Sequence, residues 1–234
     1  MKPLQTLLLA VLLAVTARAG ADDCIAMIGT GSVGGTLGPG LAGRGERIIY
    51  GSRTPDAERV QALVRRTAAN ASALTPAAAA SACGTIVLAV PWEAVEPTLR
   101  SFGNLDGKLI IDVTNPLAVR DGRVVALPVQ DSGAEYVQSL ARGATIVKAF
   151  NTINFRVMAD PAIAGGPVSV PISGDDATGK ARVAGLAAAI GLEPIDVGPL
   201  RTARYTEAMA LLYVDRLVSG RPPFEFYLRP RPAP

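Results

Sequence analysis

The chain has 234 residues, of which 49% are hydrophobic and 18% are charged, and its formal net charge at pH 7 is +3. This composition predicts a folded protein with one well-buried core, and its scattered basic residues and few aromatic rings exclude the surface that nucleic acid requires. Two cysteines and no histidine cannot supply the four ligands of a tetrahedral zinc ion, which excludes a cysteine-based metal site.

The first residues are typical of a cleavable signal peptide. Lys2 precedes an unbroken apolar run over residues 7–15, and residues 17–19, Ala-Arg-Ala, have the small-x-small pattern of a cleavage site. The run is shorter than the roughly 20 apolar residues that span a bilayer core, so a permanent anchor is the weaker interpretation. We predict a signal peptide over residues 1–19, export to the periplasm or the cell exterior, and no stable membrane span.

Residues 24–54 contain a strand, a glycine-rich turn, a helix and a second strand, which is the order of a dinucleotide-binding unit. In its Gly-x-Gly-x-x-Gly turn, the first glycine permits the tight turn, the second lets the backbone approach a pyrophosphate, and the third lets the helix pack on the strand. The free N–H groups at the helix start face the phosphates. The predicted cofactor-binding residues of the turn are Gly29, Thr30, Gly31, Ser32, Val33 and Gly34.

The second strand ends in a cation where an NAD-binding unit places a carboxylate. About twenty residues after the turn, an NAD-binding unit has Asp or Glu, which accepts a hydrogen bond from the ribose 2′-hydroxyl. This chain has Ser52, Arg53 and Thr54 there instead. Arg53 can form charge-assisted hydrogen bonds with a 2′-phosphate, and the two hydroxyls can donate beside it. The alternative for Arg53 is a solvated loop cation. We predict NADP(H) as the cofactor, with NADPH preferred over NADH.

The rest of the chain alternates between short apolar strands and alanine-rich helices, as a doubly wound, mostly parallel sheet requires. Thr75, Ser132 and Asp176 are helix-capping residues that mark three of the helix starts. We expect helices near residues 55–69, from 76, and at 91–102, 132–142, 176–191 and 203–219, and strands at 85–90, 109–113, 145–150, 168–174 and 193–198.

No internal repeat or change in composition divides the chain. We predict a single Rossmann-type α/β domain over residues 20–220, with extra C-terminal strands and a helix, followed by a mobile or loosely docked tail over residues 221–234. Cys24 and Cys83 each stand at the start of a strand, at one edge of the sheet. An exported protein can oxidise them to a disulfide, but two separate buried thiols are the favoured interpretation.

Ligands of open α/β sheets bind outside the carboxyl ends of the strands. Here those ends carry Val90-Pro91-Trp92, Thr114-Asn115-Pro116 and Phe150-Asn151-Thr152, an apolar and amide set that suits a flat redox ring. Each segment also has an ordinary structural interpretation, as a helix start, a core residue or a turn. The chain has no histidine, the usual acid or base near neutrality, and hydride transfer between two rings needs mainly their orientation. We predict no catalytic acid or base.

Several segments together resemble the NADPH-dependent reductases of the deazaflavin coenzyme F-420. These are the glycine-rich turn, residues 51–53, and the segments CGTIVLAVPW at 83–92, PISGDD at 171–176 and GLEPIDVGPLRTAR at 191–204. The middle of the chain, at residues 108–117 and 134–154, is more similar to the cytosolic NADPH domain of the six-transmembrane metalloreductases. The N-terminal part also resembles that of pyrroline-5-carboxylate reductase.

The resemblance implies a compact domain that passes hydride from NADPH to a flavin, a deazaflavin or a similar small-molecule acceptor. It places the pyrophosphate at residues 30–33 and the 2′-phosphate at Ser52 and Arg53. The nicotinamide side would be formed by Val90, with Pro91 beside it, and by Asn115 and Phe155, and the acceptor would lie near residues 208–212. Asn151 replaces a histidine of the deazaflavin reductases and Asn115 an apolar residue, so the second ring need not be a deazaflavin.

Two other functions are compatible with the sequence. One is an imine reductase of the pyrroline-5-carboxylate reductase type, and the other is a non-catalytic module that senses or stores NADP(H). The apolar part of the last helix, at residues 208–214, either buries itself in a second copy of the chain, giving a homodimer, or covers the sheet. The predicted export conflicts with the cytosolic supply of NADPH.

Overall fold

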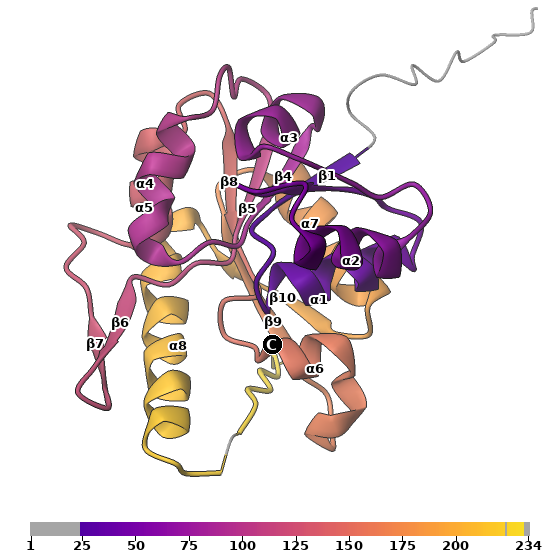
Figure 1. Ribbon diagram of the computed structural model, residues 1–234. Coiled ribbons are helices and arrows are strands. Elements are labelled where there is room, and N and C mark those ends of the chain that lie inside the picture. The colour runs from indigo at the N-terminus through magenta and orange to yellow at the C-terminus, as the bar shows by residue number, and fades with distance from the viewer. Residues whose placement is uncertain (1–23, 223, 232–234) are drawn as a thin grey trace, which may run out of the picture.

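The computed structural model describes residues 24–222 and 224–231, so the predicted signal peptide lies outside the described residues. Within these ranges the chain forms an eight-stranded, mostly parallel sheet with helices on both faces, which confirms the predicted Rossmann-type α/β fold (Figure 1). In spatial order the strands are β10 (Glu193–Gly198), β9 (Ser169–Gly174), β8 (Thr145–Lys148), β5 (Leu109–Asp112), β4 (Thr85–Leu88), β1 (Cys24–Ile28), β2 (Arg47–Gly51) and β3 (Ser72–Leu74).

One change of strand direction interrupts the parallel sheet. The strands from β8 to β3 are parallel to one another, whereas β9 is antiparallel to β8 and β10 is parallel to β9. The start of β9 at Ser169 therefore lies at the edge of the sheet where β8 and the other parallel strands end. This carboxyl edge is where the sheet is expected to bind ligands.

Helices cover both faces because alternate residues of each buried strand point to opposite sides. In β1, Ile25 and Met27 belong to one core cluster, and Ala26 and Ile28 belong to the other. The first cluster packs under α1 (Gly34–Ala42), α2 (Glu58–Thr67), α6 (Phe155–Ala159) and α7 (Ala177–Ala189); the second packs under α3 (Pro76–Ala82), α4 (Trp92–Arg100) and α5 (Gly133–Leu140).

A β-hairpin outside the main sheet was not predicted from the sequence. Its strands, β6 (Leu117–Arg120) and β7 (Arg123–Ala126), are joined by Asp121 and Gly122, which both have positive φ, at 49° and 70°. Asp-Gly is a favoured pair for such two-residue turns, so the signal was present in the sequence. Figure 1 shows the hairpin projecting beside α8 (Ala203–Val218).

The last helix packs beside α5 and the hairpin, and the segment after it returns to the main sheet at β9. Helix α8 follows the short 3₁₀ helix η2 (Leu200–Thr202) and contacts α5 and β7. Residues 224–231, called here the C-terminal segment, pack at the start of β9: the N–H of Ser169 donates to the carbonyl of Phe226 at 2.9 Å, and the N–H of Leu228 donates to Ser169 Oγ at 2.9 Å. No helix in the described ranges is long and apolar enough to cross a membrane.

The two cysteines are bonded to each other. Cys24 and Cys83, 59 residues apart in sequence, have their Cα atoms at 5.0 Å and form a disulfide. The favoured prediction of two separate thiols is therefore wrong. The reason is the register of the sheet: β1 pairs directly with β4, which brings the residues preceding Ile25 and Thr85 side by side at the amino edge.

Candidate functional site

A groove of about 930 Å³ runs along the carboxyl ends of β1, β2 and β4. Its volume is in the range of small-molecule sites, and it gathers three loops that are far apart in sequence. Of the predicted cofactor-binding residues, those that line the groove are Gly29, Thr30, Gly31, Ser52, Arg53, Thr54, Val90 and Pro91.

The glycines of the turn have different reasons to be glycine. Gly29 has φ +118°, and a Cβ there would lie 2.2 Å from the carbonyl oxygen of Ala89. A Cβ on Gly34 would lie 2.1 Å from the carbonyl oxygen of Gly29, so both residues are required by close contacts within the protein. A Cβ on Gly31 would meet nothing within 4 Å, although Gly31 lines the groove. The protein itself does not require glycine at residue 31, which leaves its backbone open to a bound molecule.

The turn also presents unused backbone donors. Val33 is the N-cap of α1. The first N–H group at the start of this helix to donate a hydrogen bond is that of Gly35, to the carbonyl of Gly31. The N–H groups of residues 30–34 donate to no atom of the part of the chain that the structure describes. Together with the positive end of the α1 dipole they can bind phosphate oxygens. Ser32, Val33 and Gly34 do not line the groove, and what they offer a ligand is their backbone N–H groups.

The end of the groove after β2 is cationic. Ser52 is buried, its N–H donates to the carbonyl of Leu74, and its Oγ accepts from the N–H of Thr54 at 3.2 Å. Arg53 is exposed beside it, and Arg59 from the first turn of α2 lines the same groove. Neither arginine forms an ion pair with any described residue, and no carboxylate lines the described groove. The sequence did not predict Arg59, and its only signal is its place in the first turn of the helix that follows Arg53.

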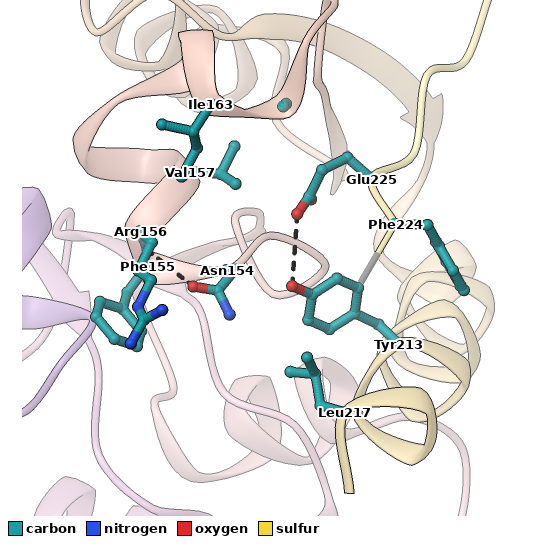
Figure 2. Close-up of a pocket in the computed structure, with 10 residues that line it drawn as sticks. Asn154, Phe155, Arg156, Val157, Ile163, Tyr213, Leu217, Phe224 and Glu225 are labelled. Carbon is teal, nitrogen blue, oxygen red and sulfur yellow. Dashed lines mark hydrogen bonds between the residues drawn. The ribbon is translucent and has the colours of Figure 1, made fainter. Parts of the chain in front are cut away.

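Two predicted nicotinamide-side residues, Asn115 and Phe155, lie outside this groove. Asn115 lines a small cavity of about 150 Å³ beside α8, and Phe155 lines a pocket of about 530 Å³ between α6 and α8 (Figure 2). Trp92 is half-buried and its ring lies 5.8 Å from that of Tyr136, away from the groove lining. Most residues predicted to hold the phosphates and the ribose therefore share one groove, whereas of those predicted for the nicotinamide only Val90 and Pro91 line it.

An amide pair joins the carboxyl ends of β5 and β8. Asn151 Nδ2 donates to Asn115 Oδ1 at 3.0 Å, and Asn115 Nδ2 donates to the carbonyl of Asn151 at 3.0 Å. Phe150, the residue before Asn151, has a backbone φ of +62°, which is unusual for a residue other than glycine. The two asparagines thus hold the ends of these two strands together.

A buried ion cluster lies next to this pair. Lys148 is fully buried, and its Nζ lies 2.9 Å from Asp112 Oδ2 and 2.9 Å from Glu207 Oε1. Glu207 also accepts hydrogen bonds from the N–H groups of Gly133 and Ala134 at the start of α5. Burial alone would lower the pKa of Lys148, but the two carboxylates outweigh it and raise the pKa. Lys148 is thus charged at neutral pH and ties β5, β8 and α8 together.

The comparisons with known proteins agree with this geometry. The family model described as "NADP oxidoreductase coenzyme F420-dependent" matches residues 24–116. Metalloreductase STEAP3 from Rattus norvegicus is 32% identical over 192 residues, which cover 80% of this chain, and the chain spans only 36% of that relative.

Solved structures extend the likeness to the whole fold. A putative F420-dependent NADP reductase from Arthrobacter sp. FB24 is 30% identical, with a TM-score of 0.79 over 88% of this chain and 99% of the other. A reductive aminase from Aspergillus terreus, 21% identical with a TM-score of 0.60, matches 85% of this chain and 60% of its own length and shares the fold. The chain belongs to the family of coenzyme F420-dependent NADP oxidoreductases.

Proposed function

We propose that this protein transfers hydride between NADP(H), bound in the groove, and a flavin or deazaflavin acceptor. The observation that carries the proposal is the open backbone at Gly31, between a set of free N–H donors and a cationic end without carboxylates. A glycine that no protein contact requires, facing a groove of this size, is accounted for by a ligand that approaches the backbone closely.

The residues present fit NADP(H). Gly29, the backbone of residues 30–33 and the start of α1 would hold the pyrophosphate, because free N–H groups at a helix start bind phosphate oxygens. Ser52, Arg53 and Thr54, together with Arg59 in the same groove lining, would hold the 2′-phosphate through charge-assisted hydrogen bonds.

The nicotinamide would lie farther along the carboxyl edge of the sheet. Val90 and Pro91 form the apolar wall of the groove there, whereas Asn115, from the loop after β5, and Phe155, at the start of α6, line two other cavities. NADPH supplies the hydride when it is bound. The role of the protein is to orient the ring and to keep one of its faces against apolar side chains.

No carboxylate, tyrosine or lysine is among the described residues that line the groove, which favours a ring acceptor over a carbonyl. Asp112 and Lys148, the charged residues that end β5 and β8, are both fully buried and paired with each other, and Lys148 is also paired with Glu207. Transfer between two redox rings needs contact and alignment more than a proton donor from the protein. The amide pair of Asn115 and Asn151 differs from the deazaflavin reductases, and we therefore include flavins among the acceptors.

The test is NADPH oxidation followed with separate acceptors under anaerobic conditions. The proposal expects turnover with FMN, riboflavin or coenzyme F420, faster with NADPH than with NADH, and little turnover with a cyclic imine. Turnover with the imine alone would favour the imine reductase, and tight NADPH binding without turnover on any acceptor would favour a binding module. Either result would overturn the proposed reaction.

We further propose that the protein is exported and works in an oxidising compartment. The bonded Cys24 and Cys83 support this, because structural disulfides are typical of exported proteins. Mass spectrometry of the protein purified from its natural host should show a chain that begins after residue 19. An intact N-terminus together with free thiols would contradict export.

A further inference from the structure

The C-terminal segment forms one wall of a second pocket, of about 530 Å³, which α6, the 3₁₀ helix η1 (Pro161–Ala164) and α8 also line (Figure 2). The segment belongs to no helix or strand. Ser169, at the start of β9, anchors it: the N–H of Ser169 donates to the carbonyl of Phe226, and its Oγ accepts from the N–H of Leu228. The position of the segment thus depends on a small number of polar contacts rather than on a ladder of hydrogen bonds.

A second anchor is a carboxyl group with an incomplete set of partners. The Tyr213 hydroxyl donates to Glu225 Oε1 at 3.4 Å, which is a long hydrogen bond, and Figure 2 shows the two side chains pointing toward each other. The other oxygen, Glu225 Oε2, is buried and accepts from no described residue. Burying a charged carboxylate without partners costs more than burying a neutral carboxyl group. The docked position therefore suits the protonated form of Glu225 better than the ionised form.

The two arginines closest to the pocket in the fold are engaged elsewhere. Arg156 lines the pocket, but its guanidinium lies over the Phe155 ring, 6.0 Å from the ring centre. The guanidinium of Arg216, on α8, lies over the Phe224 ring, 5.1 Å from its centre. Neither arginine forms an ion pair with Glu225 in the part of the chain that the structure describes. No described cation therefore compensates for ionisation of this carboxyl group.

The other groups around Glu225 do not change this conclusion. Tyr213 is the titratable lining residue on α8, the rest of the lining from α6, η1 and α8 is uncharged apart from Arg156, and Arg229 and Arg231 of the segment itself are exposed. Burial raises the pKa of Glu225, and the hydrogen bond from Tyr213 opposes this only in part. Protonation of Glu225 therefore stabilises docking fully below its ordinary pKa of 4.5, and this contribution is lost as the pH rises through the raised pKa.

We propose that the C-terminal segment is a pH-sensitive strap over the second pocket, held tightly while Glu225 is protonated and loosened when Glu225 ionises. Loosening would withdraw Phe224 and Glu225 from the pocket wall and leave the sheet intact, because the segment follows the last helix. Phe155, which we place on the nicotinamide side, lines the same pocket, so loosening would also open that side of the site. Only this last consequence rests on the proposed function.

The test is amide hydrogen exchange of the full chain without cofactor, measured by mass spectrometry and converted to protection factors. As the pH rises from about 4 to about 8, we expect peptides that contain Ser169 or Leu228 to lose at least about fivefold in protection, because a shift of one pKa unit changes the docking equilibrium about tenfold. Peptides from β1, which is buried in the core, should keep their protection. An equal loss in both sets would indicate global loosening and would overturn the proposal.

Glu225→Gln keeps the shape of the side chain but cannot ionise, so the protection of the C-terminal segment should become independent of pH. Glu193→Gln, which replaces an exposed carboxylate on β10, is the matched control and should retain the pH dependence. If Glu225→Gln does not fold, Tyr213→Phe gives a second route: it removes the donor to Glu225 and should enlarge the loss of protection.

Three results would contradict the strap. They are protection of the C-terminal segment that does not change with pH in the native protein, a pH dependence that Glu225→Gln retains, and a Tyr213→Phe variant whose loss of protection is no larger than that of the native protein. The exchange experiment contains neither NADPH nor an acceptor. Its failure is therefore distinct from failure of the proposed hydride transfer, which the acceptor assay tests.

Discussion

Replacing Arg53 by alanine isolates the proposed 2′-phosphate contact. Arg53 lines the cationic end of the groove, forms no ion pair with any described residue, and has Arg59 as its neighbour in the groove lining. Its removal should therefore disturb no other contact. We expect the Arg53→Ala variant to fold with an unchanged midpoint of thermal unfolding.

The expected loss follows from the chemistry of the contact. A hydrogen bond to a charged group contributes about 1.5–3 kcal/mol, and Arg53 is exposed and partly replaceable by Arg59, which argues for the lower part of this range. About 1.5 kcal/mol corresponds to a loss of roughly tenfold in NADPH affinity. NADH has no 2′-phosphate, so its affinity should hardly change.

Calorimetric titration of the native protein and the variant with NADPH and NADH measures both affinities directly. Arg44→Ala, an exposed arginine after α1 that does not line the groove, is the matched control and should bind both cofactors normally. Equal losses of NADPH and NADH affinity in Arg53→Ala would refute the assignment of Arg53 to the 2′-phosphate. An unchanged NADPH affinity would do the same.

Three further predictions concern stability. Gly29→Ala should lower the free energy of unfolding by about 1–3 kcal/mol because of its φ of +118° and the nearby Ala89 carbonyl, whereas Gly31→Ala should unfold like the native protein and lose NADPH affinity more than tenfold. Equal thermal midpoints for the two variants would contradict this contrast. Replacing both cysteines by serine should cost about 2–4 kcal/mol, measured by denaturant unfolding, because the disulfide closes a long loop; a loss below 1 kcal/mol would argue against it. Lys148→Met should cost about 3–5 kcal/mol because it leaves two buried carboxylates unpaired. Because the pKa of Lys148 is raised, the difference in unfolding free energy between the native protein and this variant should persist at neutral pH and shrink only as the pH rises above 10.5. A difference that already disappears near neutrality would contradict the ion-pair explanation.

The sequence by itself determined the class of fold and the residues of the proposed phosphate-binding end of the site. Apolar runs between capped, alanine-rich segments predict alternating strands and helices, and these are local properties of the chain. The glycine-rich turn and Ser52-Arg53-Thr54 belong to one continuous strand, helix and strand unit. Their proposed roles can be inferred from the sequence because a single unit of this kind positions these residues without help from the rest of the chain.

Only the tertiary structure decided the contacts between segments that are far apart in sequence. The disulfide joins residues 59 positions apart, the amide pair of Asn115 and Asn151 spans 36 positions, and the bond from Gly133 to Glu207 spans 74. The pairing of Tyr213 with Glu225 needs the C-terminal segment to dock on β9. The local propensity of a segment carries no information on which strands become neighbours or on where a distant segment packs. The ion cluster, the second pocket and the disulfide all depend on these long-range contacts.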